Sequence, residues 1–201
     1  MRLPFAREGC PYASFFAVVS LLSLRLSVWI SFCSLGLALA VLYFFRDPEK
    51  PVSASDREIL SPSDGTIRDI RQAERVCISI YLSLFDIHVT RAPVSGQVRS
   101  VHYSPGQFLA AFRKKSFLVN ENNLIEIRHE TSTVLLRQIA GTFARRIVCR
   151  CRPGDNLVRG QKIGLIRFGS GIELCLPAGT ALRVRAGDKV KISETVLGTL
   201  P

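Results

Sequence analysis

Three features that would point to other classes of protein are missing from this chain of 201 residues. Its six cysteines include no Cys-x-x-Cys pair, so the sequence indicates no zinc or other metal site. Its net charge is +11, but the basic residues form neither a basic helix nor basic strands interleaved with aromatic residues. We therefore expect no nucleic-acid partner. We also expect all six cysteines to be reduced and mostly buried, as in a cytoplasmic domain.

Charge is nearly absent from Pro11 to Phe45, where Arg25 is the one exception. Leu26 to Phe45 contains 20 uncharged residues, close to the ~20 that a helix needs to cross ~30 Å of hydrocarbon. We predict a helical membrane anchor over residues 1–45 with a spanning helix over Leu26 to Phe45. The shorter run Phe15 to Leu24 leaves open a hairpin arm, a re-entrant piece or an interfacial segment. A cleaved signal peptide is disfavoured because the apolar stretch is too long and no small-residue cleavage site follows it.

Basic residues follow the apolar stretch directly. Arg46, Lys50 and Arg57 place the rest of the chain on the cytoplasmic face of the cell membrane by the positive-inside rule, and anionic headgroups are the acidic partner that such a position offers. Residues 46–58 contain Pro48 and Pro51, which stop helix propagation, and are predicted to be a linker. The water-facing domain is expected over residues 59–201.

Helical periodicity of any length is also missing beyond residue 59, apart from a turn or two near Phe85 and from Phe108 to Lys115. Short β-branched and aromatic runs broken by Gly, Pro, Asn and Asp indicate a mainly β domain. The expected strands are Thr66 to Ile70, Val76 to Leu82, Gln97 to Tyr103, Leu124 to His129, Thr133 to Ala140, Ile163 to Phe168, Ile172 to Leu176 and Ala181 to Arg185.

Two pairs of short segments repeat within this domain. Pro62-Ser63-Asp64-Gly65-Thr66-Ile67 matches Pro93-Val94-Ser95-Gly96-Gln97-Val98, and Arg152-Pro153-Gly154-Asp155-Asn156-Leu157 matches Arg185-Ala186-Gly187-Asp188-Lys189-Val190. Each segment places a glycine at a turn before a strand. Such turns are found in lipoyl and biotinyl domains, so we predict a β-sandwich built from related hairpins.

A few polar residues are candidates for chemistry. The Gly169-Ser170 bond lies between two apolar runs; such a pair is usually a turn, and a serine becomes a nucleophile only beside a base and a polarised carbonyl. Asp64 is by itself a typical turn residue. His88 stands in an apolar run where a histidine is usually structural, although Asp86, Thr90 and Arg91 surround it. We expect the other two histidines, His102 and His129, to be exposed or structural.

Several segments from about Tyr43 to Pro177 carry a family resemblance through their order and spacing together. These are Phe44-Phe45-Arg46-Asp47-Pro48, Ser61-Pro62-Ser63-Asp64-Gly65, Phe85-Asp86-Ile87-His88-Val89-Thr90-Arg91-Ala92-Pro93-Val94-Ser95-Gly96, Pro105-Gly106-Gln107-Phe108, Asn120-Glu121-Asn122, Gln138-Ile139-Ala140-Gly141, Ala144-Arg145-Arg146-Ile147 and Arg167-Phe168-Gly169-Ser170. In this order and spacing the chain resembles phosphatidylserine decarboxylase in its short prokaryotic form.

The resemblance implies a proenzyme that cuts itself between Gly169 and Ser170, leaving a large chain 1–169 and a small chain 170–201. Ser170 would become an N-terminal pyruvoyl group, a covalent cofactor that forms a Schiff base with the substrate amine and holds the electrons left when carbon dioxide departs. The implied reaction converts phosphatidylserine to phosphatidylethanolamine. The implied catalytic residues are Ser170, His88 and Asp64, and homo-oligomerisation is left open.

Two segments depart from the family pattern. Larger members have a second histidine where this chain has Arg91, and that histidine pairs with the aspartate matching Asp64 to activate the serine. An arginine cannot act as a base, so either His88 serves both steps or Asp64 and a water molecule do. The family's more usual Leu-Gly-Ser-Thr appears here as Phe168-Gly169-Ser170-Gly171, as in the short forms.

Two other classes of function remain open from the sequence. One is a processed but inactive homologue, or a decarboxylase of a different serine-headed lipid such as the archaetidylserine of ether-lipid membranes. The other is a non-catalytic, membrane-anchored binding module of the lipoyl type, for which Lys189 and Lys191 are the lysines near a hairpin tip, without the neighbours expected of a modified lysine.

Overall fold

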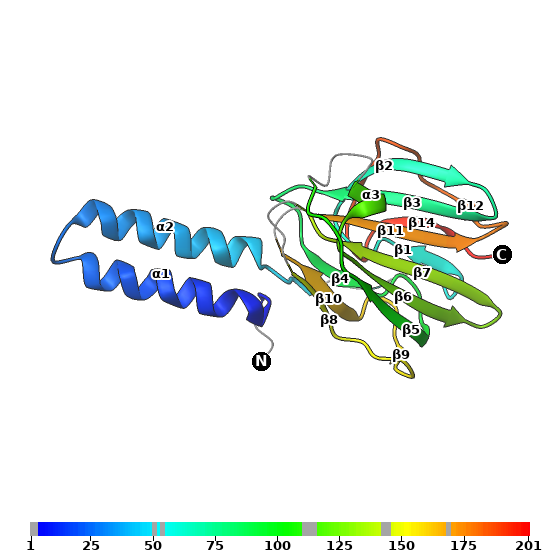
Figure 1. The fold of residues 1–201 in the computed structure, drawn as a ribbon, viewed down its shortest axis with the longest axis horizontal. Coiled ribbons are helices and arrows are strands. Elements are labelled where there is room, and N and C mark those ends of the chain that lie inside the picture. The colour runs from blue at the N-terminus through cyan, green and yellow to red at the C-terminus, as the bar shows by residue number, and fades with distance from the viewer. Residues whose placement is uncertain (1–3, 50–51, 53–54, 110–115, 142–145, 168–169) are drawn as a thin grey trace. The chain divides into compact units, whose positions relative to one another are not determined.

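The computed structural model describes residues 4–49, 52, 55–109, 116–141, 146–167 and 170–201. The chain divides into two compact units, Met1–Glu49 and Lys50–Pro201. The first unit is helical and the second consists mainly of β-strands, as the sequence predicts (Figure 1).

The first unit is a helical hairpin. A short 3-10 helix η1 (Arg7–Gly9) leads into α1 (Cys10–Ser23), which has Pro11 in its first turn, where a missing N–H costs nothing. After a tight turn, α2 runs over Val28–Phe44. The two ends of the hairpin are joined by the backbone bond from Ala6 N–H to the Phe45 carbonyl, 2.7 Å long.

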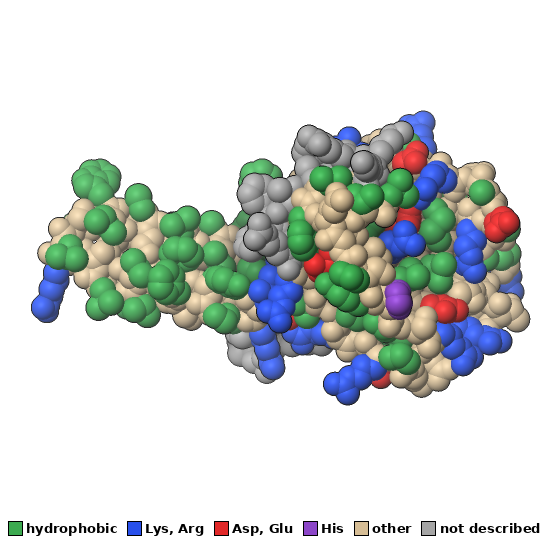
Figure 2. Space-filling model, viewed as in Figure 1, with side chains coloured by type: hydrophobic (Ala, Val, Ile, Leu, Met, Phe, Trp, Pro, Cys, Tyr) green, Lys and Arg blue, Asp and Glu red, His purple; other side chains and the backbone are tan. Residues whose placement is uncertain are grey.

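Serine side chains line the seam between the two helices. Ser20 Oγ donates to the Ser31 carbonyl and Ser31 Oγ to the Ser20 carbonyl, both at 2.9 Å, while Ser34 Oγ donates to the Phe16 carbonyl at 2.7 Å. Large apolar side chains instead point outward and are spread over the visible surface of the hairpin (Figure 2), with Leu26 85% and Trp29 80% exposed. The hairpin is therefore polar along its seam and apolar outside.

The second helix is shorter than the predicted span. Where the sequence predicts a span over Leu26 to Phe45, α2 has 17 residues. Within the described part of the chain, no helix is long and apolar enough to cross a membrane. The predicted spanning helix is thus not confirmed.

The second unit contains fourteen strands among its described residues and a four-residue helix, α3 (Ser116–Val119). The strands are β1 (Glu58–Leu60), β2 (Gly65–Gln72), β3 (Arg75–Leu82), β4 (Val89–Arg91), β5 (Gly96–Ser104), β6 (Asn122–His129), β7 (Ser132–Ile139), β8 (Ile147–Cys149), β9 (Asn156–Leu157), β10 (Lys162–Ile166), β11 (Ser170–Pro177), β12 (Ala181–Leu182), β13 (Lys189–Val190) and β14 (Val196–Thr199).

Antiparallel pairing arranges these strands in three sheets. The largest has the order β13-β2-β3-β11-β7-β6-β5-β9, and two three-stranded sheets have the orders β4-β10-β8 and β1-β14-β12. Each long predicted strand overlaps an observed one; Ala181 to Arg185 is reduced to the two residues of β12. β11 lies inside the largest sheet, between β3 and β7 (Figure 1).

The two sequence repeats occupy equivalent places at opposite ends of the largest sheet. β2 and β5 both begin at a glycine with positive φ, Gly65 at 149° and Gly96 at 156°. The turn Arg185–Asp188 closes against β2 through Gly187 N–H to the Ile67 carbonyl, and Arg152–Asp155 closes against β5 through Gly154 N–H to the Val98 carbonyl, both at 2.8 Å. The internal repeat is therefore a structural one, although a relation to lipoyl domains is not confirmed.

Alternation along the central strands builds the core. The apolar side chains of β3 and β11 that are 0% exposed are Ile78, Ile80, Leu82, Ile172, Leu174 and Leu176. Because side chains alternate between the faces of a strand, the intervening residues of β3 and β11 share the opposite face. Cys77 and Cys175 are on that face.

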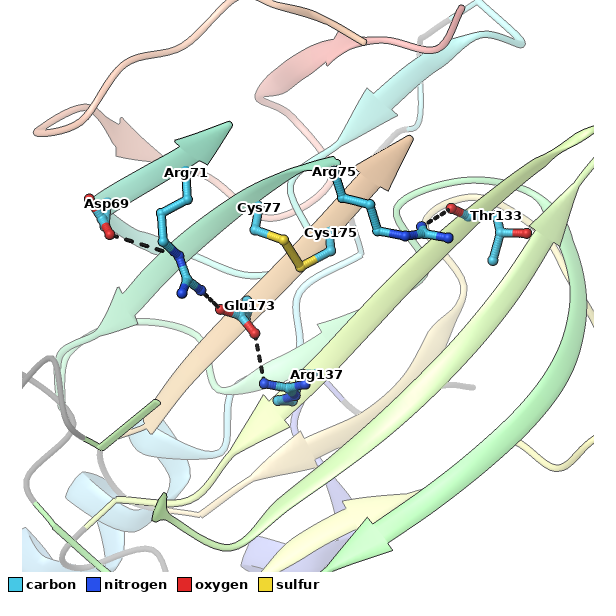
Figure 3. The surroundings of a disulfide bond; sticks show 8 residues. All are labelled: Asp69, Arg71, Arg75, Cys77, Thr133, Arg137, Glu173 and Cys175. Carbon is cyan, nitrogen blue, oxygen red and sulfur yellow. Dashed lines mark hydrogen bonds and ion pairs between the residues drawn. A yellow bond between two sulfur atoms is a disulfide. The ribbon is translucent and has the colours of Figure 1, made fainter. Parts of the chain in front are cut away.

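Cys77 and Cys175 form a disulfide between β3 and β11 (Figure 3). They are direct partners in the antiparallel register with Cα atoms 4.0 Å apart, a closely spaced position at which the side chains approach. The prediction that all six cysteines are reduced is wrong for this pair, because sequence spacing does not show that two residues 98 positions apart are neighbours in a sheet.

Candidate active site

The candidate site lies where two strand pairs meet. β3 pairs with β11, and Leu82 at the end of β3 is the partner of Ser170 at the start of β11. β4 pairs with β10, and the Ile166 N–H at the end of β10 donates to the His88 carbonyl at 3.1 Å. Four residues of extended chain reach about 14 Å, so Ser170 is confined to that range of Ile166. The fold thus brings the His88 segment and the start of β11 to one corner; Gly169 lies outside the described residues.

His88 is buried, with 3% of its surface exposed. Its Nδ1 lies 2.8 Å from the carbonyl oxygen of Asp86. A carbonyl can only accept, so Nδ1 donates, and Nε2 is the basic nitrogen of the neutral ring. His88 is therefore oriented by its own loop, because its Nδ1 is held by the hydrogen bond to the Asp86 carbonyl.

A turn rigidifies the loop that carries His88. Asp86 Oδ2 accepts hydrogen bonds from both the N–H and the hydroxyl of Ser83, each at 2.7 Å. The tip of this turn exposes two apolar side chains, Leu84 at 50% and Phe85 at 76%. Asp86 therefore acts on His88 through its backbone carbonyl, while its carboxylate holds the turn.

Asp64 connects the His88 loop to the C-terminal segment. Its Oδ1 accepts the Ile192 N–H at 2.8 Å and its Oδ2 the Ile87 N–H at 3.3 Å. Ile87 and Ile192 also pack together with Val89 in a small apolar cluster. Asp64 thus reaches the residue next to His88 through the backbone, from a position that the sequence alone assigns to a turn.

Two buried hydroxyls flank the Asp64 contacts. Ser63 and Ser193 are 0% and 2% exposed, and neither hydroxyl oxygen has a hydrogen-bond partner among the described residues. Ser193 also adopts a left-handed backbone with φ 57°. A buried hydroxyl without a partner is uncommon in native proteins. The sequence carries no signal for these two groups.

Arg91 stands where the family pattern has a second histidine. Its Nη1 donates to the Gly160 carbonyl at 3.0 Å, which anchors β4 to the turn before β10. The neighbouring Thr90 accepts a 3.0 Å hydrogen bond from Gln138 Nε2, and Gln138 in turn accepts one from Asn123. This buried polar chain reaches β6 and was not predicted.

Phe117 explains the glycine that follows Ser170. A Cβ added to Gly171 would lie 2.7 Å from Cζ of the Phe117 ring, closer than real Cβ contacts. Phe117 belongs to α3, which thereby covers the start of β11. A larger residue at position 171 would have to displace this ring.

A buried carboxylate follows on the same strand. Glu173 is 4% exposed and contacts Arg71 of β2 and Arg137 of β7, with Arg137 Nη1 2.9 Å from Glu173 Oε2 (Figure 3). Two cations around one buried carboxylate satisfy its oxygens and tie β11 to strands on either side. Glu173 was not predicted as a site residue.

Cys149 and Cys151 form a close thiol pair, with 3.4 Å between the two sulfur atoms. The hydrogen bond from the Cys151 thiol lowers the pKa of Cys149 to about 6, while the same contact raises the pKa of Cys151. Cys149 is therefore expected to be a thiolate at neutral pH. These two cysteines agree with the predicted reduced state.

The remaining histidines are placed as expected. His102 is exposed on β5, and His129 Nδ1 donates to the Ser95 carbonyl at 2.7 Å. Of the predicted site residues, the structure thus brings Asp64 and His88 to the corner where β11 begins at Ser170.

Fold and site together define a mainly antiparallel β domain that carries a helical hairpin and has a serine at the start of an interior strand. Comparison with known proteins identifies its family. The family model described as phosphatidylserine decarboxylase matches residues 37–198. The chain therefore belongs to the phosphatidylserine decarboxylase family.

Relatives match over nearly the whole length of the chain. The phosphatidylserine decarboxylase proenzyme of Symbiobacterium thermophilum is 41% identical, covering 100% of this chain and 98% of the relative. Those of Desulfotalea psychrophila and Nitrosomonas europaea are 39% and 41% identical, covering 99% and 96% of this chain and 98% and 93% of the relatives. The resemblance seen in the sequence is confirmed.

Proposed function

We propose that this protein decarboxylates phosphatidylserine to phosphatidylethanolamine after cutting its own chain between Gly169 and Ser170. The observation that carries the proposal is the position of Ser170, the first residue of an interior strand, at the corner where Ile166 is bonded to His88. The names of the relatives supply the reaction and the proenzyme state.

The proposed cleavage uses atoms of the chain itself. The Ser170 hydroxyl attacks the Gly169 carbonyl, and the acyl group moves from nitrogen to oxygen. Elimination releases the large chain with a Gly169 carboxylate and leaves a dehydroalanine, whose hydrolysis releases ammonia. The balance leaves a ketone at position 170, which is the pyruvoyl group.

Position 170 fits such a group. Its backbone is set in register by Leu82, and Gly171 leaves the space beside it to the Phe117 ring. The pyruvoyl group would supply an electron-withdrawing carbonyl for attachment of the substrate amine and for uptake of the electrons left by decarboxylation. Position 170 and its neighbours would hold this group. His88 and Asp64 would transfer protons and orient the reacting groups.

His88 is the proposed proton-transfer residue of turnover. With Nδ1 donating to Asp86, Nε2 is the nitrogen that can accept and return a proton. Burial excludes bulk water from the ring, so the proton that replaces carbon dioxide on the product would come from Nε2. Orientation by the Ser83 and Asp86 turn supports this role.

Asp64 is proposed to act in the cleavage step. Its two oxygens each accept one backbone N–H, and a carboxylate has lone pairs beyond those two. Through Ile87 it sets the position of His88, so Asp64 can support proton removal from Ser170 either directly or through His88. Arg91, bonded to Gly160, has no role in proton removal in this proposal.

The helical hairpin is proposed to attach the enzyme to the membrane that contains its substrate. Its helices of 14 and 17 residues span about 21 and 26 Å, and its apolar side chains face outward around a serine seam. Small polar residues at a helix contact with apolar residues outside are typical of packing in lipid. Hydrocarbon would remove the exposed apolar surface from water.

We propose the cytoplasmic face of the cell membrane for the β domain. The basic residues after the hairpin favour that face, whereas a disulfide is more common in oxidising compartments. Labelling Cys149 in intact cells with a membrane-impermeant maleimide distinguishes the cytoplasmic face from the opposite face. Labelling only after the membrane is permeabilised supports the cytoplasmic face.

The function is tested with purified full-length protein and vesicles that contain phosphatidylserine labelled in the serine carboxyl group. Release of labelled carbon dioxide is expected from the wild type and not from Ser170→Ala, which lacks the nucleophile. Intact mass should show a small chain lighter than its sequence predicts, because an amine has become a ketone. Release of carbon dioxide by an uncut chain would contradict the pyruvoyl mechanism. Activity confined to a serine-headed ether lipid would reassign the substrate.

A further inference from the structure

The disulfide between Cys77 and Cys175 crosses the proposed cleavage site in the sequence. Cys77 belongs to residues 1–169, and Cys175 is the one cysteine of residues 170–201. We propose that this disulfide holds the large and small chains of the mature enzyme together as one covalent molecule. The proposal rests on the cleavage proposed above. The cut breaks the peptide bond between the two chains, and the disulfide keeps them covalently joined.

The register explains why these two residues meet in the folded precursor. β11 pairs with β3 over eight residues, from Ser170 opposite Leu82 to Pro177 opposite Arg75, and Cys77 is the direct partner of Cys175. The small chain begins at the first residue of this ladder. The cut therefore leaves the whole β11–β3 ladder between two separate chains.

The small chain is an interior part of the domain. β11 also pairs with β7, and its buried residues Ile172, Leu174 and Leu176 belong to the main core. Glu173 adds ion pairs with Arg71 and Arg137, both of the large chain. Non-covalent contacts thus hold the small chain while the domain is folded.

The covalent link matters when the domain unfolds. Without it, unfolding of the cut enzyme separates a chain of 169 residues from one of 32, and refolding needs an encounter between two molecules. With it, the small chain stays attached beside β3 at a high effective concentration. The disulfide therefore converts a two-molecule folding equilibrium into a one-molecule equilibrium.

Formation of the link requires an oxidant. The thiols of Cys77 and Cys175 together lose two protons and two electrons, and a low-molecular-weight disulfide or a thiol oxidoreductase in its disulfide form takes them up and becomes two thiols. Because β3 and β11 are paired before the cut, the link can form in the precursor.

The test compares reduced and non-reduced wild-type protein after exposed thiols have been blocked with N-ethylmaleimide. We expect one covalent species without reductant and two chains, of 169 and 32 residues, after reduction. Cut chains that separate without reductant would refute the link while leaving the proposed function intact. A single full-length chain after reduction would refute the cleavage and, with it, the link.

Variants identify the partner and the consequence. Cys77→Ser and Cys175→Ser should each release the small chain without reductant, whereas Cys149→Ser and Cys151→Ser should not; release by either of the latter two would move the link to that residue and refute the proposal.

In cut Cys175→Ser, the midpoint of thermal unfolding should rise with protein concentration, and in the wild type it should not. Uncut Ser170→Ala/Cys175→Ser is the matched control, with a midpoint independent of concentration. Decarboxylation by folded Cys175→Ser should stay close to wild type, because the ladder and the ion pairs of Glu173 remain.

Discussion

The backbone N–H of Ile166 donates to the carbonyl oxygen of His88 at 3.1 Å, joining two segments that are 78 positions apart in the sequence. This bond ties the end of β10 to the loop before β4. The bond places the His88 loop next to the short connection that leads to β11. The proposed chemistry of Ser170 and the orientation of His88 therefore depend on the same corner of the fold.

Replacing His88 with Asn tests its proton-transfer role. The Asn amide can still donate to the Asp86 carbonyl from a position close to Nδ1, so the loop should keep its shape, but no basic nitrogen replaces Nε2. Decarboxylation per cut molecule should fall by about 10²-fold or more, measured as carbon dioxide release normalised to the small chain. His102→Asn, on the exposed side of β5, is the control. Unchanged turnover in His88→Asn would remove His88 from the reaction.

Replacing Gly171 with Ala tests the cover formed by Phe117. The added methyl group would meet the aromatic ring at 2.7 Å, so either the ring or the start of β11 must move, and self-cleavage should slow. Phe117→Ala in the same chain makes room and should restore the cleavage rate toward that of Phe117→Ala alone, as followed by intact mass over time. Gly36→Ala, where a Cβ meets nothing within 4 Å, is the control. Equal cleavage of Gly171→Ala and wild type would show that the ring does not constrain this residue.

Replacing Glu173 with Gln should destabilise the domain. Two arginines would lose the carboxylate that they share, and breaking one side of a buried ion pair costs about 3 kcal/mol, less where a partner such as Arg71 is half exposed. Denaturant unfolding in the Ser170→Ala background measures the change without the cut. Glu130→Gln, in the turn between β6 and β7, should leave the free energy of unfolding unchanged. A neutral Glu173→Gln would mean that the ion pairs add no net stability.

The thiol pair predicts a pH dependence. Because the Cys151 thiol lowers the pKa of Cys149 to about 6, alkylation of Cys149 by iodoacetamide should rise through a midpoint near that value, well below the ordinary thiol range. A lowered pKa also means that the thiolate adds stability above the unfolded-state pKa and that this contribution is lost as the pH falls through about 6. Cys151→Ala removes the donor and should move the alkylation midpoint up; no movement would assign the shift to another group. Peptide mass mapping gives the rate for Cys149 separately.

Removing the hairpin should separate membrane attachment from chemistry. A chain that begins at Asp47 keeps the β unit, which is compact by itself, so it should fold and cut itself. It should lose most of its activity on vesicles, because it no longer concentrates at the surface where the substrate lies, and recover activity on detergent-dispersed substrate. Full activity of the shortened chain on vesicles would refute a role for the hairpin in reaching the substrate. Release of the full-length protein from membranes by carbonate would refute insertion.

Local patterns in the sequence determined the class of fold and the position of the proposed chemistry. Alternating apolar residues over β3, β5, β6, β7 and β11 predict strands because a side-chain period of two is a local property of extended backbone. The uncharged stretch before Arg46 predicts helices for a similar reason. The Gly169-Ser170 pair and the other motifs identified the family together, because the order and spacing of motifs along a chain can be read from the sequence without knowing the fold.

Only the tertiary structure decided which distant residues became neighbours. The uncharged run from Leu26 to Phe45 is compatible with one spanning helix. The reciprocal hydrogen bonds between Ser20 and Ser31 instead join α1 and α2 in a hairpin. Asp64 has the sequence of a turn residue, and its bonds to Ile87 and Ile192 depend on strand pairing over 128 positions. The disulfide of Cys77 depends on the register of β3 against β11. Register is a property of whole sheets, set by how both faces pack, so no spacing within the sequence could reveal it.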